Sequence, residues 1–174
     1  MRPSTVVSLA AVSGVPALAV LGIALTVHHH PREVGFTDSG VNVAMRLSGD
    51  GKKLLTTFTP QRPGFHLYSV GLPAEGIDGL GRPTRVEVAG ALHDRGPLTA
   101  KSPVRMLPMQ GTDTKFPVYP DGPVTTELPV SVVKTHQGAK VTVSYAACSP
   151  QECLMPVMGH PVELSASALK AMRG

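Results

Sequence analysis

The sequence predicts an all-β protein, an immunoglobulin-like antiparallel β-sandwich that follows one N-terminal apolar helix. Three observations support this fold class. Apolar and polar residues alternate with period two in about seven short stretches, which is typical of strands with one buried face. The 17 prolines and 18 glycines separate most of these stretches and suit tight turns. Beyond the apolar segment, the one helical pattern is the short run Ser165–Met172 at the C-terminus.

The first element is an apolar segment from Thr5 to Val27, which contains 23 residues without a charge. At about 1.5 Å per helical residue it can cross a hydrocarbon layer of about 30 Å. A single charge before it, on Arg2, favours export of the rest of the chain. Residues 1–27 are therefore either an uncleaved transmembrane signal anchor or a cleaved signal peptide. We favour the anchor because no clear Ala-x-Ala site closes the segment. In both cases the domain is extracytoplasmic, in the periplasm or at the cell surface.

The remaining chain is divided into a tether, one domain and a tail. Residues 28–40 are predicted to be a polar, weakly ordered tether, in which the three histidines 28–30 form a polar flank at the membrane interface. Residues 41–165 are predicted to form the domain, and residues 166–174 a C-terminal tail. The expected strands are Val41–Leu47, Lys53–Thr59, His66–Ser69, Thr84–Ala89, Thr125–Val133, Lys140–Ala147 and Gly159–Leu164. Residues 90–123 are rich in Pro and Gly and weakly patterned, which predicts mostly loop.

Composition excludes several classes of function. Aromatic residues are only 4% and there is no tryptophan, so a stacking surface for nucleic acid is not predicted. The net charge of +4 is spread along the chain, which indicates solubility rather than a polyanion site. No Ser/His/Asp set, carboxylate pair or phosphate-binding glycine loop stands in a suitable context. Hydrolase chemistry, nucleotide chemistry and a bound cofactor are therefore not expected.

The chemistry is concentrated at Cys148 and Cys153, the two cysteines of the chain. Cys148 ends a strand-like run, Ser149-Pro150 suits a turn, and an apolar run begins at Cys153. This arrangement brings the two Cβ atoms across the mouth of a hairpin, close enough for a disulfide, and export allows the bond to persist.

So short a loop restricts the unfolded chain little, since even a loop of about 15 residues contributes only ~3 kcal/mol. We therefore interpret the bond between the two cysteines as one that exchanges with other thiols. The alternative is a structural disulfide in a protein-interaction module.

The run from Tyr145 to Pro156, Tyr-Ala-Ala-Cys-Ser-Pro-Gln-Glu-Cys-Leu-Met-Pro, resembles a known cysteine hairpin. It is similar to that of the N-terminal, extracytoplasmic domain of the thiol:disulfide interchange protein DsbD family. Two other patches agree with this resemblance. They are Pro63–Ser69 followed by Gly81–Thr84, and Val118-Tyr119 followed by Leu128–Val130. Together the similar segments span roughly residues 41–164.

The resemblance implies an immunoglobulin-like redox domain. Cys148 and Cys153 would receive electrons from a thioredoxin-like domain or a membrane electron-transfer protein and pass them to exported thiol proteins. Tyr145 and Pro156 would frame the pair. The chemistry would be thiolate attack on a partner disulfide, a mixed disulfide, and resolution by the second cysteine. We expect Cys148 to be the attacking residue.

The sequence departs from the family in three ways. Four residues separate the cysteines here, where the best-known form has five. The family covers its cysteines with a loop that bears an aromatic, whereas the matching residues 110–115 have none. Phe116, Met106 or Met109 would have to take that place. The family protein also continues into membrane and thioredoxin-like domains, so a chain that stops at Gly174 would receive its electrons from a separate protein.

An exported copper-binding protein is the rival prediction. Met155, Met158 and His160 follow the cysteines closely, and copper(I) prefers thiolate and thioether ligands. However, methionines more often fill irregular packing. Met155 and Met158 also lie an odd number of residues apart, so a simple strand would send them to opposite faces. We therefore predict no resident metal, and we interpret His66 as a packing or surface residue.

Overall fold

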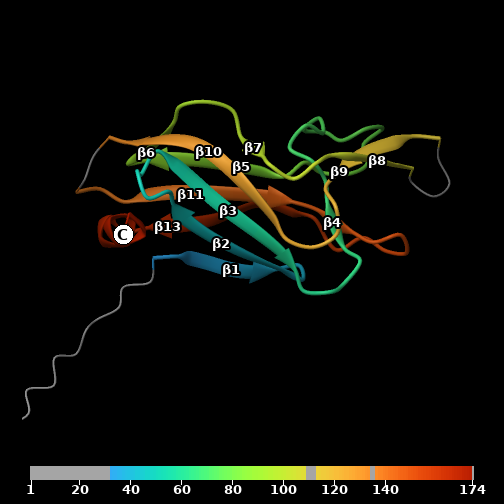
Figure 1. Cartoon of the computed structure of the whole chain (residues 1–174), viewed down its shortest axis with the longest axis horizontal. Helices are drawn as coiled ribbons and strands as arrows, with labels where there is room; N and C mark the ends of the chain where they lie inside the picture. Colours follow the sequence, from blue (N-terminus) through green and yellow to red (C-terminus); the bar gives the residue numbers. More distant parts are fainter. Residues whose placement is uncertain (1–31, 109–112, 134–135, 174) are drawn as a thin grey trace, which may run out of the picture.

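The computed structural model describes residues 32–108, 113–133 and 136–173. Within these ranges, thirteen strands and one short helix form an immunoglobulin-like sandwich of two antiparallel sheets, with two small sheets at one end (Figure 1). This confirms the predicted fold class. The described ranges contain no helix that is long and apolar enough to span a membrane. The predicted segment from Thr5 to Val27 lies outside them.

The larger sheet has the strand order β1-β2-β3-β10-β6, and β7 also pairs with β10. Its inner face is apolar because buried and less buried residues alternate along β2, β3 and β10, as period-two patterning requires. The strands are β1 (Val34–Asp38), β2 (Val41–Leu47), β3 (Lys53–Pro60), β6 (Leu92–Asp94), β7 (Thr99–Ala100) and β10 (Val124–Val132).

The smaller sheet has the order β13-β11-β5 and covers the inner face of the larger one. Its strands are β5 (Arg85–Gly90), β11 (Ala139–Tyr145) and β13 (Val157–Leu164). Val141 and Val143 of β11 are fully buried in the shared core. Phe58 of β3 meets Tyr145 of β11 edge to face, with ring centroids 5.5 Å apart. Such contacts fix how the two sheets face each other.

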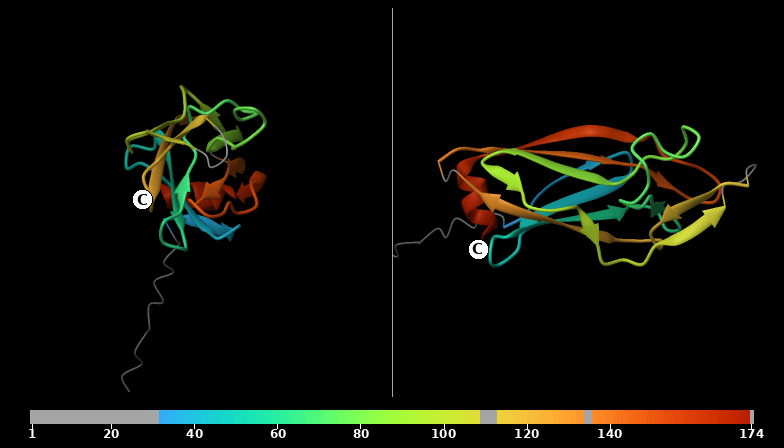
Figure 2. Two further views of the ribbon diagram at one scale, coloured as in Figure 1. Left: turned by 90° about the vertical axis from the view of Figure 1, so that its right-hand side faces the viewer. Right: turned by 90° about the horizontal axis from the view of Figure 1, so that it is seen from above.

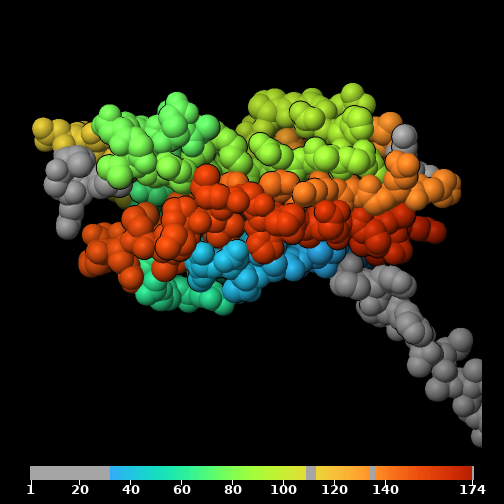
Figure 3. Space-filling view, turned by 180° about the vertical axis from the view of Figure 1, so that it is seen from behind, coloured from blue at the N-terminus to red at the C-terminus, as the bar shows by residue number. Residues whose placement is uncertain are grey.

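Strand β1 corrects the expectation of a weakly ordered tether over residues 28–40. Residues 34–38 pair with β2 through a two-residue turn, because Ser39 and Gly40 both adopt positive φ values of 44° and 68°. This backbone conformation matches the twist of a hairpin. The ring of Phe36 stacks on His160 of β13 at 3.7 Å. In the space-filling view the blue β1 therefore lies along the red β13 (Figure 3).

Residues 90–123 contain more strand than the sequence predicts. Besides β6 and β7 they hold β8 (Arg105–Pro108) and β9 (Lys115–Val118), which pair with each other. We call this β8–β9 unit the cap hairpin. Near it, β4 (His66–Leu67) pairs with β12 (Ala147–Cys148). These two small sheets occupy the end of the sandwich opposite the C-terminal helix (Figure 2).

Helix α1 (Ala166–Met172) begins where the sequence predicts a helical pattern. The hydroxyl of Ser165 caps it by accepting a hydrogen bond from the Ala168 amide at 3.1 Å. Leu169 and Met172 are buried in the main core. This C-terminal segment is thus packed into the folded domain. The predicted boundary at residue 27 lies outside the described residues and stays a prediction.

Candidate redox site

Cys148 and Cys153 form a disulfide, with their Cα atoms 4.0 Å apart. Cys148 is the last residue of β12, and the two cysteines also face each other as an isolated antiparallel bridge. Directly after Cys153, the Leu154 amide donates to the carbonyl of Ala147 at 2.9 Å. The disulfide therefore closes the mouth of a tight hairpin, which confirms the close pair expected from the sequence.

The turn between the cysteines is organised by Ser149. Its amide donates to the Glu152 carbonyl at 2.7 Å. Its hydroxyl oxygen accepts hydrogen bonds from the amides of Gln151 and Glu152, at 3.3 and 3.2 Å. A serine that bonds amides two and three residues ahead is a turn-forming residue. Arg62 ties the turn to the loop after β3 through a 2.7 Å ion pair with Glu152. These contacts thus fix the turn between the two cysteines.

The two cysteines differ in exposure. Cys148 is buried, at 4% exposure, in a small apolar cluster with Tyr68, Phe116 and Val118. Cys153 is exposed to solvent. A partner that approaches the disulfide therefore meets Cys153 first.

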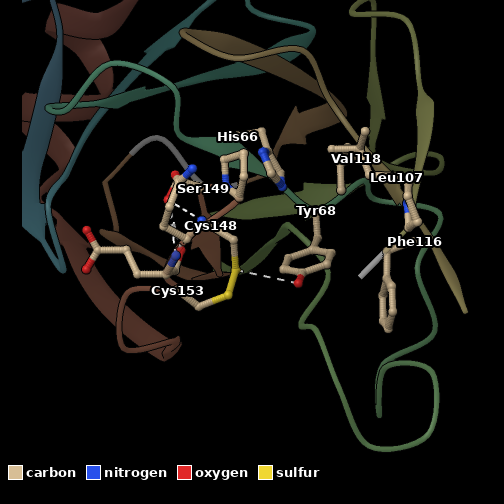
Figure 4. Close-up of a pocket in the computed structure, with 12 residues that line it drawn as sticks. His66, Tyr68, Leu107, Phe116, Val118, Cys148, Ser149 and Cys153 are labelled. Atoms are coloured by element: carbon tan, nitrogen blue, oxygen red, sulfur yellow. Dashed lines mark hydrogen bonds between the residues drawn. A yellow bond between two sulfur atoms is a disulfide. The ribbon is translucent and has the colours of Figure 1, made fainter. Parts of the chain in front are cut away.

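The disulfide lies in the wall of an open cavity of about 540 Å³ under the cap hairpin (Figure 4). Three parts of the chain form it: the strand around β4, the cap hairpin and the cysteine hairpin. The lining residues are His66, Tyr68, Leu107, Pro108, Phe116, Val118 and all six residues from Cys148 to Cys153. Most of these side chains are apolar, so a partner side chain that enters would be desolvated beside the disulfide.

Tyr68 points its phenol at the disulfide. Its oxygen lies 3.5 Å from Sγ of Cys148. A disulfide sulfur carries no hydrogen, so the phenol is the donor. The Tyr68 ring packs edge to face against Phe116, with centroids 5.8 Å apart. The backbone carbonyl of Tyr68 accepts a 2.7 Å hydrogen bond from the Thr84 hydroxyl. Burial raises the pKa of Tyr68, which keeps the phenol protonated and able to donate.

His66 is the ionisable side chain on the opposite strand from Cys148. The register of β4 and β12 places the two residues directly across from each other. Nδ1 of His66 lies 3.7 Å from Asp121, and Arg105 reaches the same carboxylate at 3.5 Å. Burial lowers the pKa of His66; Asp121 opposes this effect and Arg105 adds to it. The imidazole therefore stands neutral at neutral pH in the cavity wall.

The site residues expected from the sequence lie in different places. Phe116 lines the cavity and is 2% exposed. Tyr145 and Pro156 are not among the residues that line it. Tyr145 is buried in the main core, where its hydroxyl donates to the carbonyl of Asp38 at 2.8 Å and burial raises its pKa. Pro156 is exposed beyond the hairpin.

The side chains considered for copper lie mostly in solvent. Met155 and Met158 are 78% and 65% exposed. Of the two methionines considered in place of the family's aromatic, Met106 is 55% exposed and Met109 lies outside the described residues. His160 is engaged with β1, because its ring stacks on Phe36 and its Nδ1 lies 3.1 Å from Asp38. In the described part of the chain, no group of three or more His, Cys, Asp or Glu side chains is placed to hold a metal ion.

Sequence reasoning missed Tyr68 and His66 as site residues. Both belong to the patch Pro63–Ser69, whose sequence resemblance supports the fold but does not mark them as site residues. A usable signal was present, because residues 66 and 68 share one face of a strand and Cys148 ends another strand. What the pattern does not reveal is that these two strands pair with each other.

Neither the protein-family models nor the curated proteins contain a match to this chain. Among solved structures, the chain is similar to the N-terminal domain of DsbD from Neisseria meningitidis in its reduced form. The sequence identity is 12%, the TM-score is 0.49, and the match covers 72% of this chain and 85% of that chain.

The chain is also similar to the N-terminal periplasmic domain of ScsB from Proteus mirabilis. Here the identity is 14% and the TM-score 0.49, over 76% of this chain and 50% of that chain.

Proposed function

We propose that this chain is an extracytoplasmic thiol–disulfide interchange domain that relays reducing equivalents through Cys148 and Cys153. The observation that carries the proposal is the environment of the disulfide. One sulfur belongs to a buried residue and has a hydrogen-bond donor, while the other belongs to an exposed residue at an open apolar cavity. A structural disulfide in an inert module needs neither a cavity nor a donor.

The unequal exposure of the cysteines supports different roles for them in the exchange. A thiolate of a reduced, thioredoxin-like donor attacks Sγ of Cys153, the exposed residue. The Cys148–Cys153 bond breaks, a mixed disulfide forms, and Cys148 leaves as a thiolate. Tyr68 donates a hydrogen bond to that leaving sulfur, which stabilises its negative charge. This assignment reverses the preference for Cys148 as the attacking residue that we drew from the sequence.

The remaining steps complete a two-electron transfer. The donor's second thiolate attacks the donor's other sulfur, which is bonded to Cys153 in the mixed disulfide. This step releases Cys153 as a thiolate and leaves the donor with a disulfide. The Cys153 thiolate then attacks the disulfide of an exported acceptor protein. Finally Cys148 attacks Sγ of Cys153, reforms the disulfide and releases the acceptor's thiolate. Solvent supplies the protons that the released thiolates take up.

We also propose that the apolar segment from Thr5 to Val27 anchors the domain outside the cytoplasm. Such an anchor would keep the relay close to the membrane.

Trapping of the mixed disulfide tests the proposed function. The full chain carrying Cys148→Ser keeps a free thiol at Cys153. It is mixed with a thioredoxin-like protein whose resolving cysteine is replaced by serine and whose remaining cysteine is activated as a mixed disulfide with a good leaving group. We expect a stable covalent complex through Cys153. The chain carrying Cys153→Ser should form at least tenfold less complex in the same time, because Cys148 is buried. Equal trapping by both variants would contradict the assigned roles, and trapping by neither would contradict the relay.

A further inference from the structure

A second hollow lies at the end of the sandwich opposite the disulfide. Its volume is about 260 Å³, and three arginines from separate parts of the chain line it. Arg32 precedes β1, Arg46 lies on the exposed side of β2, and Arg173 follows helix α1. The rest of the lining is Leu47, Gly49 and Met172. The fold thus brings three arginines together around a small hollow.

None of these arginines forms an ion pair with a carboxylate of the described residues. The acidic groups nearest in sequence are Glu33, which is exposed, and Asp50. Asp50 is engaged in its own turn, where it accepts hydrogen bonds from the Ser48 hydroxyl at 2.6 Å and from the Lys52 amide at 3.1 Å. The three arginines thus give this hollow an excess of positive charge, which favours an anion.

The position of this cluster indicates where the anion comes from. Arg32 stands only five residues after Val27, the last residue of the apolar segment. Fully extended, five residues reach at most about 18 Å. Helix α1 and the start of β1 lie at this end of the molecule, while β4, β8 and the cysteine hairpin lie at the other (Figure 1). A chain anchored through that segment would hold the arginines close to the lipid headgroups.

We propose that Arg32, Arg46 and Arg173 bind the phosphate groups of anionic phospholipids and so hold the redox end of the sandwich away from the membrane. Guanidinium groups pair with phosphate oxygens through two parallel hydrogen bonds, which suits a surface of phosphodiesters. This inference depends on membrane anchoring but not on thiol exchange. Its consequence is an orientation in which the exposed Cys153 faces soluble partners.

A single tryptophan reports contact between this end and the membrane, because the chain has none of its own. Gly49 is a suitable position, since a Cβ there meets no atom within 4 Å and the residue lies beside the arginines. The full-length Gly49→Trp chain is reconstituted into vesicles of brominated phosphatidylcholine, with or without about a third of phosphatidylglycerol. We expect at least twofold stronger quenching with the anionic lipid. High salt should remove the difference, because it screens exposed charges.

Two variants of the Gly49→Trp chain provide the comparison. Replacement of Arg32, Arg46 and Arg173 by glutamine should abolish the lipid dependence. Replacement of Arg62, Arg105 and Lys115 by glutamine removes the same charge at the redox end and should preserve it. A Gln151→Trp chain, which carries its reporter in the cysteine hairpin, should stay unquenched in both lipids. Near-ultraviolet circular dichroism confirms that each variant is folded.

Three outcomes would overturn the proposal. Equal quenching in both lipids, or an unchanged response after replacement of the three arginines, would show that the cluster does not contact lipid. Loss of quenching in inorganic phosphate, but not in chloride of equal ionic strength, would assign the hollow to a free anion instead. Disulfide exchange is measured separately on the same samples, so failure of the lipid contact and failure of the relay are distinguishable.

Discussion

At Cys148 the sulfur has a hydrogen-bond contact with the phenol of Tyr68 at 3.5 Å. In the disulfide this hydrogen bond is long and weak. It becomes stronger when Cys148 carries a negative charge, because hydrogen bonds to ionised acceptors are shorter and stronger. Tyr68 thus acts mainly on the leaving thiolate, which is where exchange needs help.

The variant Tyr68→Phe tests this role. We expect it to slow reduction of the disulfide by dithiothreitol about three- to tenfold, since one hydrogen bond contributes about 0.5–1.5 kcal/mol. The measurement is a stopped-flow rate at fixed pH. The matched control is Tyr119→Phe, which loses a hydrogen bond donated by the Val70 amide and is not among the residues that line the cavity. Equal rates for Tyr68→Phe and the unmodified chain would contradict the role.

His66 makes stability depend on pH. Because burial lowers the pKa of His66 in the folded state, the unfolded chain binds more protons between that folded pKa and about 6.5. Stability should therefore fall as the pH drops below about 6.5 and level off below the folded pKa. His66→Gln should lack this part of the loss. Urea unfolding at about pH 7.5 and pH 5 measures it, with His93→Gln on the exposed side of β6 as control. An unchanged pH dependence in His66→Gln would refute the prediction.

At the scale of elements, the cysteine hairpin places both sulfur atoms within bonding distance through its turn. Two amides of this turn depend on the hydroxyl of Ser149. In the reduced protein the turn is the local feature that keeps the thiols near each other, so it sets how readily the disulfide closes.

Ser149→Ala should therefore make the disulfide easier to reduce. Without these hydrogen bonds the turn of the reduced protein is looser. The two thiols then meet less often, so their effective concentration relative to each other is lower. A cost of about 0.7–1.4 kcal/mol corresponds to a potential about 15 to 30 mV more positive. Equilibration with glutathione measures it. The control is Ser131→Ala on β10, which removes a hydroxyl that accepts a hydrogen bond from Arg95. It should leave the potential unchanged. A shift of equal size in both variants would argue against a local role of the turn.

Helix α1 contributes more than its seven residues suggest. Leu169 is 4% exposed and belongs to the main core. Leu169→Ala should lower the free energy of unfolding by about 2–4 kcal/mol, because it leaves a cavity in the main core. Ser167→Ala on the same helix should change it by less than about 0.5 kcal/mol, since that side chain is exposed. Urea titrations compare the two, and similar values would place the helix outside the core.

The sequence predicts an element well when its own apolar and polar residues alternate clearly, and poorly when they do not. Strand β2 is evident because its buried residues alternate strictly. Strand β1 was missed although Ser39-Gly40 is a turn signal, because only Val34 and Phe36 mark its inner face beside the polar stretch that follows the apolar segment. The cap hairpin was missed because Pro108 and Pro117 argue against strands.

The site was predictable to a similar extent. The disulfide follows from two cysteines on either side of a Ser-Pro turn. The unequal exposure of Cys148 and Cys153 does not, because the small apolar cluster that covers Cys148 is formed by residues of the cap hairpin and of the strand around β4. Likewise, Tyr145 stands close to Cys148 in the sequence but turns into the main core. Long-range packing decides both points.

At the scale of the whole molecule, the sandwich separates two surfaces of different chemistry. The cysteine hairpin, with its disulfide and apolar cavity (Figure 4), lies at one end. Helix α1 and the start of β1, which flank the arginine cluster, lie at the other end (Figure 1). The two sheets between them form one continuous core. Such an arrangement suits a relay that is held at a membrane by one end and meets soluble proteins with the other.

The reduction potential of the Cys148–Cys153 disulfide tests the central claim most directly. The full chain is equilibrated with defined ratios of reduced and oxidised glutathione or dithiothreitol, and the free thiols are quantified. A relay requires a potential in the range of thiol-exchange proteins, about −120 to −270 mV, and we expect a value within it. A value below about −300 mV would mark a structural disulfide and contradict the relay.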